Sequence, residues 1–163
     1  MATRSARTCC TAHPSRNSSR NYCSKIVVIT PLISMSLGTS SSSDGTDVVS
    51  QAVNRAADAG IVPVIAAGNS GPAKYTIGSP GAASGALTVA AMSDPAQGGF
   101  GLASFSSRGP TQDNRMKPEI SAPGVSIMSC KANSGNQYIS FSGTSMATPF
   151  DILTLRPPTQ RLV

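Results

Sequence analysis

Short apolar runs separated by glycine, serine and proline fill residues 26–150 of the chain. Runs of this length that are rich in β-branched residues predict strands covered on both faces. The expected strands are 26–29 and 33–36, which Pro31 divides, followed by 62–67, 87–92, 119–121, 126–129 and 138–141. Pro63 conflicts with a place inside a sheet, because proline has no N–H to donate to a neighbouring strand.

A helix with one apolar face is predicted over residues 47–59, because apolar positions recur there at intervals of three and four. These positions are Val49, Ala52, Val53 and Ala56. Thr46 is the expected N-cap, and Gly60 is expected to end the helix. The order strand, helix, strand from Ile33 to Ala67 indicates a βαβ unit, so we expect an α/β fold with a parallel central sheet.

The two ends of the chain differ from its middle. Residues 1–25 contain five basic residues, no acid and no periodic pattern, which is typical of a disordered basic head. Residues 151–163 allow about one helical turn before two consecutive prolines end it, so we expect an irregular tail. The sequence therefore predicts one partial domain over residues 26–150, placed between this head and this tail.

The net charge of +6 also lies in the ends, because six basic and six acidic residues cancel within residues 26–150. A nucleic-acid-binding domain carries its basic residues on the folded face, so we expect no nucleic-acid partner. Binding through the Arg-rich head is the remaining alternative of that class. It predicts steeply salt-dependent binding that disappears when residues 1–25 are removed.

Neither a membrane nor a metal is indicated by the composition. No apolar stretch reaches the roughly 20 residues of a membrane helix, and residues 1–20 lack the apolar core of a signal peptide. Cys9, Cys10 and Cys23 lie in the head and Cys130 in the body, a spacing that fits no metal site. We therefore expect no membrane partner, no metal and no cofactor.

Residues 141–149, FSGTSMATP, carry the first candidate chemistry. A strand-like run ends at Phe141, Gly143 permits a sharp turn, and Ser145 falls in the first turn of an expected helix. Unpaired N–H groups at a helix start can stabilise an oxyanion beside a nucleophilic serine, although serine there is also a common helix cap. The whole string resembles the nucleophile motif of the subtilisin family, which implies that Ser145 is the catalytic nucleophile.

Residues 64–72, VIAAGNSGP, carry the second. A buried strand runs into a glycine-flanked loop with one asparagine, and on these residues alone Asn69 is an ordinary turn residue. The segment resembles the A-A-G-N string of subtilisins. That resemblance implies that the side-chain amide of Asn69 donates to the oxyanion.

The third segment, residues 33–38, is similar to the M-S-L-G edge strand of the same family. The resemblance implies that an extended polypeptide substrate pairs with this backbone by β-augmentation. Ser36, Leu37 and Gly38 would then line one wall of the pocket for the side chain before the scissile bond. Ala66, Ala67 and Gly68 would form the opposite wall. Residues 104–110 and 117–124 also resemble structural strings of subtilisins, and Ser79–Pro80 stands where the family often has a cis peptide.

The subtilisin strings that supply the catalytic aspartate and histidine, D-T/S-G and H-G-T-H, do not occur in the sequence. The single histidine, His13, lies in the head and fits neither string. Asp44, Asp47 and Asp58 follow the substrate strand and are expected to be solvated. The resemblance thus implies a partial three-layer subtilisin-like sandwich of a secreted serine endopeptidase, inactive as this chain alone. A non-catalytic peptide-binding fragment that uses the edge strand is the alternative.

Overall fold

The computed structural model describes residues 31–93 and 101–155 of the chain. The elements follow one another as β1 (Leu32–Met35), α1 (Val48–Asp58), β2 (Val62–Ala66), β3 (Leu87–Met92), β4 (Ile120–Pro123), β5 (Ile127–Cys130), β6 (Tyr138–Phe141) and α2 (Thr144–Leu155). The expected strand over residues 26–29, the basic head and the last eight residues of the tail lie outside the described residues.

The expected parallel sheet is confirmed. Strands β1 to β4 form one sheet in chain order, and each neighbouring pair is parallel. Pro63 is accommodated in β2 because its backbone nitrogen, which carries no hydrogen, faces β3 and not β1. The N–H of Val62 donates toward β1, to Pro31, so alternation turns Pro63 to the other side, where pairing with β3 begins only at Val64.

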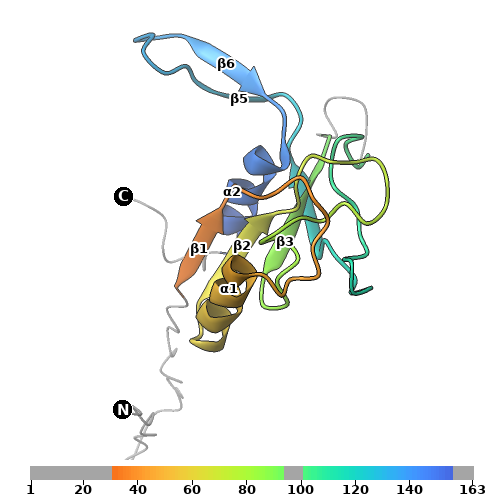
Figure 1. Cartoon of the computed structure of the whole chain (residues 1–163). Coiled ribbons are helices and arrows are strands. Elements are labelled where there is room, and N and C mark those ends of the chain that lie inside the picture. Colours follow the sequence, from red (N-terminus) through yellow and green to blue (C-terminus); the bar gives the residue numbers. More distant parts are fainter. Residues whose placement is uncertain (1–30, 94–100, 156–163) are drawn as a thin grey trace, which may run out of the picture.

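The two helices cover opposite faces of this sheet, which gives three layers (Figure 1). Val64 and its neighbour Ile65 on β2 point to opposite faces, and each belongs to a different core cluster. Val64 packs in the cluster that includes Ala147 of α2, whereas Ile65 packs in the cluster that includes Val53 of α1. Small residues such as Ala91 of β3 lie on the side toward α2, so this helix can approach the sheet closely.

Helix α1 begins one residue later than expected. Its N-cap is Asp47, whose side chain accepts hydrogen bonds from the N–H groups of Val49 and Ser50. The prediction that Thr46 caps the helix was wrong, because a capping oxygen must reach these two groups from the residue just before the first helical turn. The expected end is confirmed: Gly60 has φ +85°, a conformation that favours glycine.

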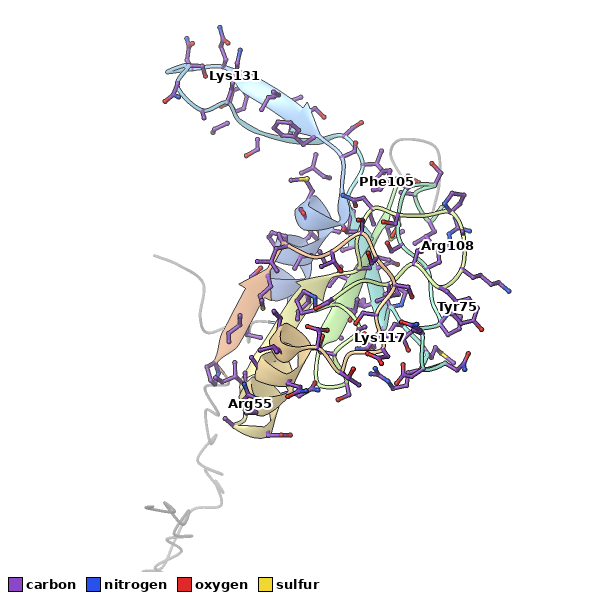
Figure 2. The ribbon with its side chains drawn as sticks, in the orientation of Figure 1. Arg55, Tyr75, Phe105, Arg108, Lys117 and Lys131 are labelled. Atoms are coloured by element: carbon purple, nitrogen blue, oxygen red, sulfur yellow. The ribbon has the colours of Figure 1, made fainter. Side chains whose placement is uncertain are left out.

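An ion pair with one buried partner lies where β3 and β4 begin. The ammonium of Lys117, a residue only 5% exposed, donates to the carbonyl of Ala86 at 2.6 Å and pairs with Glu119 at 2.5 Å. The other carboxylate oxygen of Glu119 accepts from the N–H of Thr88 at 2.8 Å. Figure 2 labels Lys117 within the body of the fold. Burial lowers the pKa of Lys117, and the charge of Glu119 opposes that shift.

Strands β5 and β6 form an antiparallel hairpin that projects from the sheet (Figure 1). Lys131 lies at its far end (Figure 2). After the hairpin the chain returns to the body, and Gly143 donates from its N–H to the carbonyl of Gly124 at 2.8 Å. Helix α2 starts at the next residue and continues to Leu155, five residues past the domain boundary expected at Phe150.

Candidate active site

An open cleft of about 370 Å³ lies beside the start of α2. Its lining comes from the segment after β1, the end of β2 and the loop that follows it, and the first turn of α2. The lining residues are Ser36, Leu37, Gly38, Thr39, Ser40, Ala66, Gly68, Asn69, Ser70, Thr144 and Ser145. None of these side chains is charged, so backbone groups, hydroxyls and one amide determine the chemistry of the cleft.

Ser145 occupies the first turn of α2, as the sequence predicts. Its hydroxyl donates to the carbonyl oxygen of Ser36 at 3.2 Å, and the hydroxyl of Ser36 donates back to the carbonyl oxygen of Ser145 at 3.0 Å. This reciprocal pair joins the segment after β1 to α2. The hydroxyl proton of Ser145 therefore rests on a backbone carbonyl, which is not a base that could activate the oxygen.

The orientation of Asn69 follows from its partners. The Oδ1 atom of Asn69 accepts from the N–H and from the hydroxyl of Thr144, each at 3.0 Å. A backbone N–H can only donate, so the atom facing it must be the amide oxygen. The Nδ2 atom is the other end of the same amide, and a Cβ built on Gly143 would lie 3.5 Å from it. The donor end of Asn69 is therefore directed toward the turn that precedes Ser145.

A second donor accompanies this amide. The first N–H groups of a helix have no carbonyl partner within the helix. In α2 the N–H of Thr144 is taken by Asn69, and the N–H of Met146 donates to Gly143 at 3.0 Å. The N–H of Ser145 has no partner within the described residues. Two donors, this N–H and the Asn69 amide, are thus available beside the Ser145 hydroxyl.

The predicted substrate wall after β1 is exposed and has free backbone groups. β1 is the edge strand of the sheet, and Ser36, Leu37 and Gly38 follow it with exposed side chains or Cα atoms. Across the part of the chain that the structure describes, the backbone of Leu37 and Gly38 makes no hydrogen bond. These groups are free to pair with an extended peptide.

Two of the three residues expected on the opposite wall line the cleft. Ala66 and Gly68 line the cleft, but Ala67 does not. Its side chain is buried with Ile77 and Ala82 in a separate cluster. Successive side chains of an extended strand point to opposite sides, so Ala67 faces away from the side of Ala66, the last residue of β2.

Sequence reasoning missed the contribution of Thr144. Its hydroxyl accepts from the N–H of Gly68 at 3.2 Å and donates to Asn69, so it ties the loop after β2 to the start of α2. Thr144 is 1% exposed. The signal was present, because Thr144 stands within the nine-residue string around Ser145, but only tertiary contacts show what it holds. Thr39, Ser40 and Ser70 also line the cleft without having been predicted.

The described residues offer no general base to Ser145. The only histidine of the chain, His13, lies outside them. Within residues 31–93 and 101–155, no three histidine, cysteine, aspartate or glutamate side chains come together as a metal site. The expectation that Asp47 is solvated was wrong: it is half-buried, with both carboxylate oxygens hydrogen-bonded.

The environment of Asp47 favours its ionised form. Burial raises the pKa of this carboxyl group, but hydrogen bonds from Ser50, Ser79 and Ser43 together outweigh burial. The pKa of Asp47 is therefore held well below its ordinary value. Asp47 does not line the cleft, so it has no direct access to Ser145.

Comparison with known proteins agrees with this geometry. The sequence profile of the subtilase family matches residues 30–150. Serine protease AprX of Bacillus subtilis (strain 168) is 44% identical over 136 residues, covering 72% of this chain and 31% of AprX. A thermostable alkaline protease of Halalkalibacterium halodurans is 46% identical over 118 residues, covering 72% of this chain and 28% of that protein. The chain thus spans about a third of the length of these relatives.

Solved structures show the same relationship. Sphericase superposes with a TM-score of 0.60 at 42% sequence identity, over 74% of this chain and 40% of that chain. The S41 psychrophilic protease gives a TM-score of 0.60 at 40% identity. The family profile covers well over half of the chain and includes all three segments that form the cleft. The chain therefore belongs to the subtilase family.

Proposed function

We propose that this chain is the nucleophile-bearing part of a subtilisin-like serine endopeptidase that acts on polypeptides. The observation that carries the proposal is the arrangement of Ser145, whose hydroxyl lies beside two available donors, its own N–H and the amide of Asn69. Membership of the subtilase family and the protease names of the relatives support it. The catalytic aspartate and histidine of the reaction must then come from outside the residues that the structure describes.

The chemistry assigned to the cleft is acyl transfer. The Oγ atom of Ser145 attacks the carbonyl carbon of a peptide bond, its proton passes to a base, and the carbonyl oxygen becomes an oxyanion. The C–N bond then breaks, and the amine leaves with the proton that the base returns. Asn69 and the N–H of Ser145 stabilise that oxyanion. In a subtilisin, loss of the corresponding asparagine costs about 10²–10³ in kcat. Loss of the histidine in such an enzyme costs on the order of 10⁶, so we expect this chain alone to give no measurable peptidase turnover.

Added imidazole can test the proposal by replacing the missing base. In its presence, a fluorophosphonate probe should bond to the Oγ atom of Ser145 as fluoride leaves and imidazole takes the proton. Peptide mapping by mass spectrometry locates the adduct, and its rate of formation measures how strongly the cleft activates the reaction. We expect a rate that increases with imidazole concentration and falls about 10²-fold or more in Asn69→Ala.

Two variants act as controls for this experiment. Ser145→Ala should abolish the adduct, whereas Ser142→Ala, in which the neighbouring exposed serine is replaced, should leave the rate unchanged. An adduct on another serine, or equal rates in the wild type and Asn69→Ala, would contradict the proposed function. Labelling without imidazole at the rate of an intact protease would contradict the expected inactivity of the isolated chain.

One observation favours peptide binding without catalysis as a second candidate function. The Ser145 hydroxyl rests on the carbonyl of Ser36, while the backbone of Leu37 and Gly38 stays available for an extended peptide. A non-catalytic fragment would bind such a peptide saturably and lose binding in Gly38→Leu. A Cβ at this position would lie 3.2 Å from the carbonyl oxygen of Ser79, closer than an ordinary contact, so the substrate wall would have to shift. Imidazole would then produce no adduct on Ser145.

We also propose that the protein acts outside the cell. Support comes from a relative named minor extracellular protease Epr, of Bacillus subtilis (strain 168), which is 37% identical over 134 residues. Among the helices that the structure describes, none could cross a membrane. Fractionation of the native source, with detection by an antibody against the chain, tests this location.

A further inference from the structure

The carboxylate of Asp47 binds far more donors than a helix cap requires. Its Oδ1 atom accepts from the N–H groups of Val49 and Ser50, each at 3.0 Å, and these two bonds complete the cap of α1. The same oxygen accepts from the hydroxyl of Ser79 at 2.7 Å. The Oδ2 atom accepts from the hydroxyls of Ser50 at 2.6 Å and Ser43 at 3.3 Å. One charge thus joins α1 to two separate loops.

Those two loops are the ones that support the substrate wall. The N–H of Thr39, a lining residue, donates to the carbonyl of Ser79 at 2.8 Å, and the N–H of Ser79 donates to the hydroxyl of Thr39 at 3.1 Å. Farther along, the N–H of Ser43 donates to the carbonyl of Ile77 at 2.9 Å. The segment after Gly38 is therefore held against residues 77–79, and Asp47 binds a residue of each, Ser43 and Ser79.

We propose that Asp47 is a positioning residue for the peptide-binding wall of the cleft, acting through Ser79 and Thr39. The inference rests on the proposed function, because it assigns the wall to an extended peptide. The carboxylate touches neither substrate nor Ser145. Asp47 fixes the position of the Thr39 backbone. It thereby also fixes the position of the neighbouring backbone N–H and C=O groups of Leu37 and Gly38, which are free to bind a peptide. Ionised oxygens suit this role, since hydrogen bonds to a charge are stronger than neutral ones.

Ser79→Ala separates positioning from capping. This change removes the hydroxyl that links the loop to Asp47, but it leaves the Asp47 bonds to Val49 and Ser50 in place. Ser84→Ala is the matched control. Ser84 also donates from its hydroxyl to a side chain of α1, Asn54, at 3.1 Å, yet it lies outside the cleft. Asp47→Asn keeps the cap, because asparagine caps as well as aspartate. It removes the charge and replaces the acceptor Oδ2, which the hydroxyls of Ser50 and Ser43 use, with a donor.

Two measurements on the full chain test the inference. The first is amide hydrogen exchange at Thr39 by NMR. The second is the Kd of a fluorescein-labelled hexapeptide with a central leucine, measured by fluorescence polarisation. In Ser79→Ala we expect exchange at Thr39 to quicken, and Kd to rise, by about tenfold each, the factor that corresponds to one charged hydrogen bond. Asp47→Asn should change both in the same direction, and Ser84→Ala should change neither.

Imidazole-dependent labelling of Ser145 by a small fluorophosphonate distinguishes positioning from general damage. The small probe does not use the wall, so its rate should stay within about twofold of the wild type in Ser79→Ala, while the peptide Kd rises. Equal Thr39 exchange in the wild type, Ser79→Ala and Asp47→Asn would overturn the inference. If Thr39 responds as expected but the wild-type chain binds no peptide, the proposed function fails and Asp47 merely braces the loop.

Discussion

Gly124 is the position where the close approach of α2 to the sheet can be tested most directly. It lies between β4 and the hairpin and is buried. A Cβ placed there would lie 2.7 Å from the Cβ of Ala91, 2.9 Å from the carbonyl oxygen of Gly143 and 3.2 Å from the Cβ of Ala147. None of these atoms can move by a side-chain rotation. Gly124→Ala must therefore push α2 away from β3.

The cost can be worked out from these contacts. Carbon atoms in ordinary contact lie about 3.5–4.0 Å apart, so the contact with Ala91 is too short by about 1 Å. Overpacking a core costs about 1–3 kcal/mol, and three simultaneous contacts place this change near the upper end. Replacing glycine recovers about 0.4–1 kcal/mol by restricting the unfolded chain. A net loss of about 2 kcal/mol follows, which corresponds to a fall in Tm of roughly 10 °C.

Urea unfolding followed by circular dichroism measures this loss, and Gly101→Ala is its control. Among the residues that the structure describes, a Cβ at Gly101 would meet only the hydroxyl oxygen of Ser93, at 3.6 Å. That variant should stay within about 0.5 kcal/mol of the wild type. Because Gly143 donates to Gly124, the displaced helix should also slow labelling of Ser145. A Gly124→Ala chain as stable as Gly101→Ala would refute the argument that α2 packs this closely.

Three further predictions concern single groups. Asn69→Asp keeps the oxygen that accepts from Thr144 but replaces the Nδ2 donor with a negatively charged oxygen. The Tm should therefore stay near that of the wild type, while the rate of imidazole-dependent labelling falls at least as far as in Asn69→Ala. Retained labelling would argue against a role of Asn69 in stabilising the oxyanion. Folding lowers the pKa of Asp47, so its contribution to the free energy of unfolding should be complete above its ordinary pKa of 3.8 and should be lost as the pH falls below that value. The acid unfolding curves of Asp47→Asn and the wild type should therefore converge at low pH. Burial lowers the pKa of Lys117, so just below pH 10.5 the unfolded chain binds a proton that the folded chain has lost. The free energy of unfolding of the wild type relative to Lys117→Met should therefore rise with pH through that window, and a flat difference would show that folding leaves the pKa of Lys117 unchanged.

Sequence patterns located the elements well where the signal was local. The intervals of apolar residues marked α1 within a residue at each end, and the strand expected at residues 87–92 has those bounds in the structure. Gly60 was identified as the end of α1 because a positive φ is a property of a single residue. The N-cap was missed by one position, since Thr46 and Asp47 are both good caps and only backbone geometry distinguishes them.

The candidate site was predictable in outline for a different reason. Ser145, Asn69 and the Ser36–Gly38 segment stand in strings long enough to resemble a family, and the structure brings all of them to one cleft. The direction of a single side chain was not predictable from such strings. Ala67 stands within the A-A-G-N string, yet the alternation of the extended chain turns it away from the cleft and into a separate cluster.

What the sequence determined by itself was therefore most of the helices and strands and the parallel α/β arrangement, and its motifs marked Ser145 and Asn69 as the proposed nucleophile and amide donor. Periodicity and motifs act over a few neighbouring residues. Only the tertiary structure decided how these parts cooperate. Ser36 and Ser145 are 109 positions apart and exchange two hydrogen bonds, and Asp47 reaches Ser79 across 32 positions. No local pattern encodes such pairs. They follow from the packing of two helices on opposite faces of one sheet, which brings distant loops together at its edge.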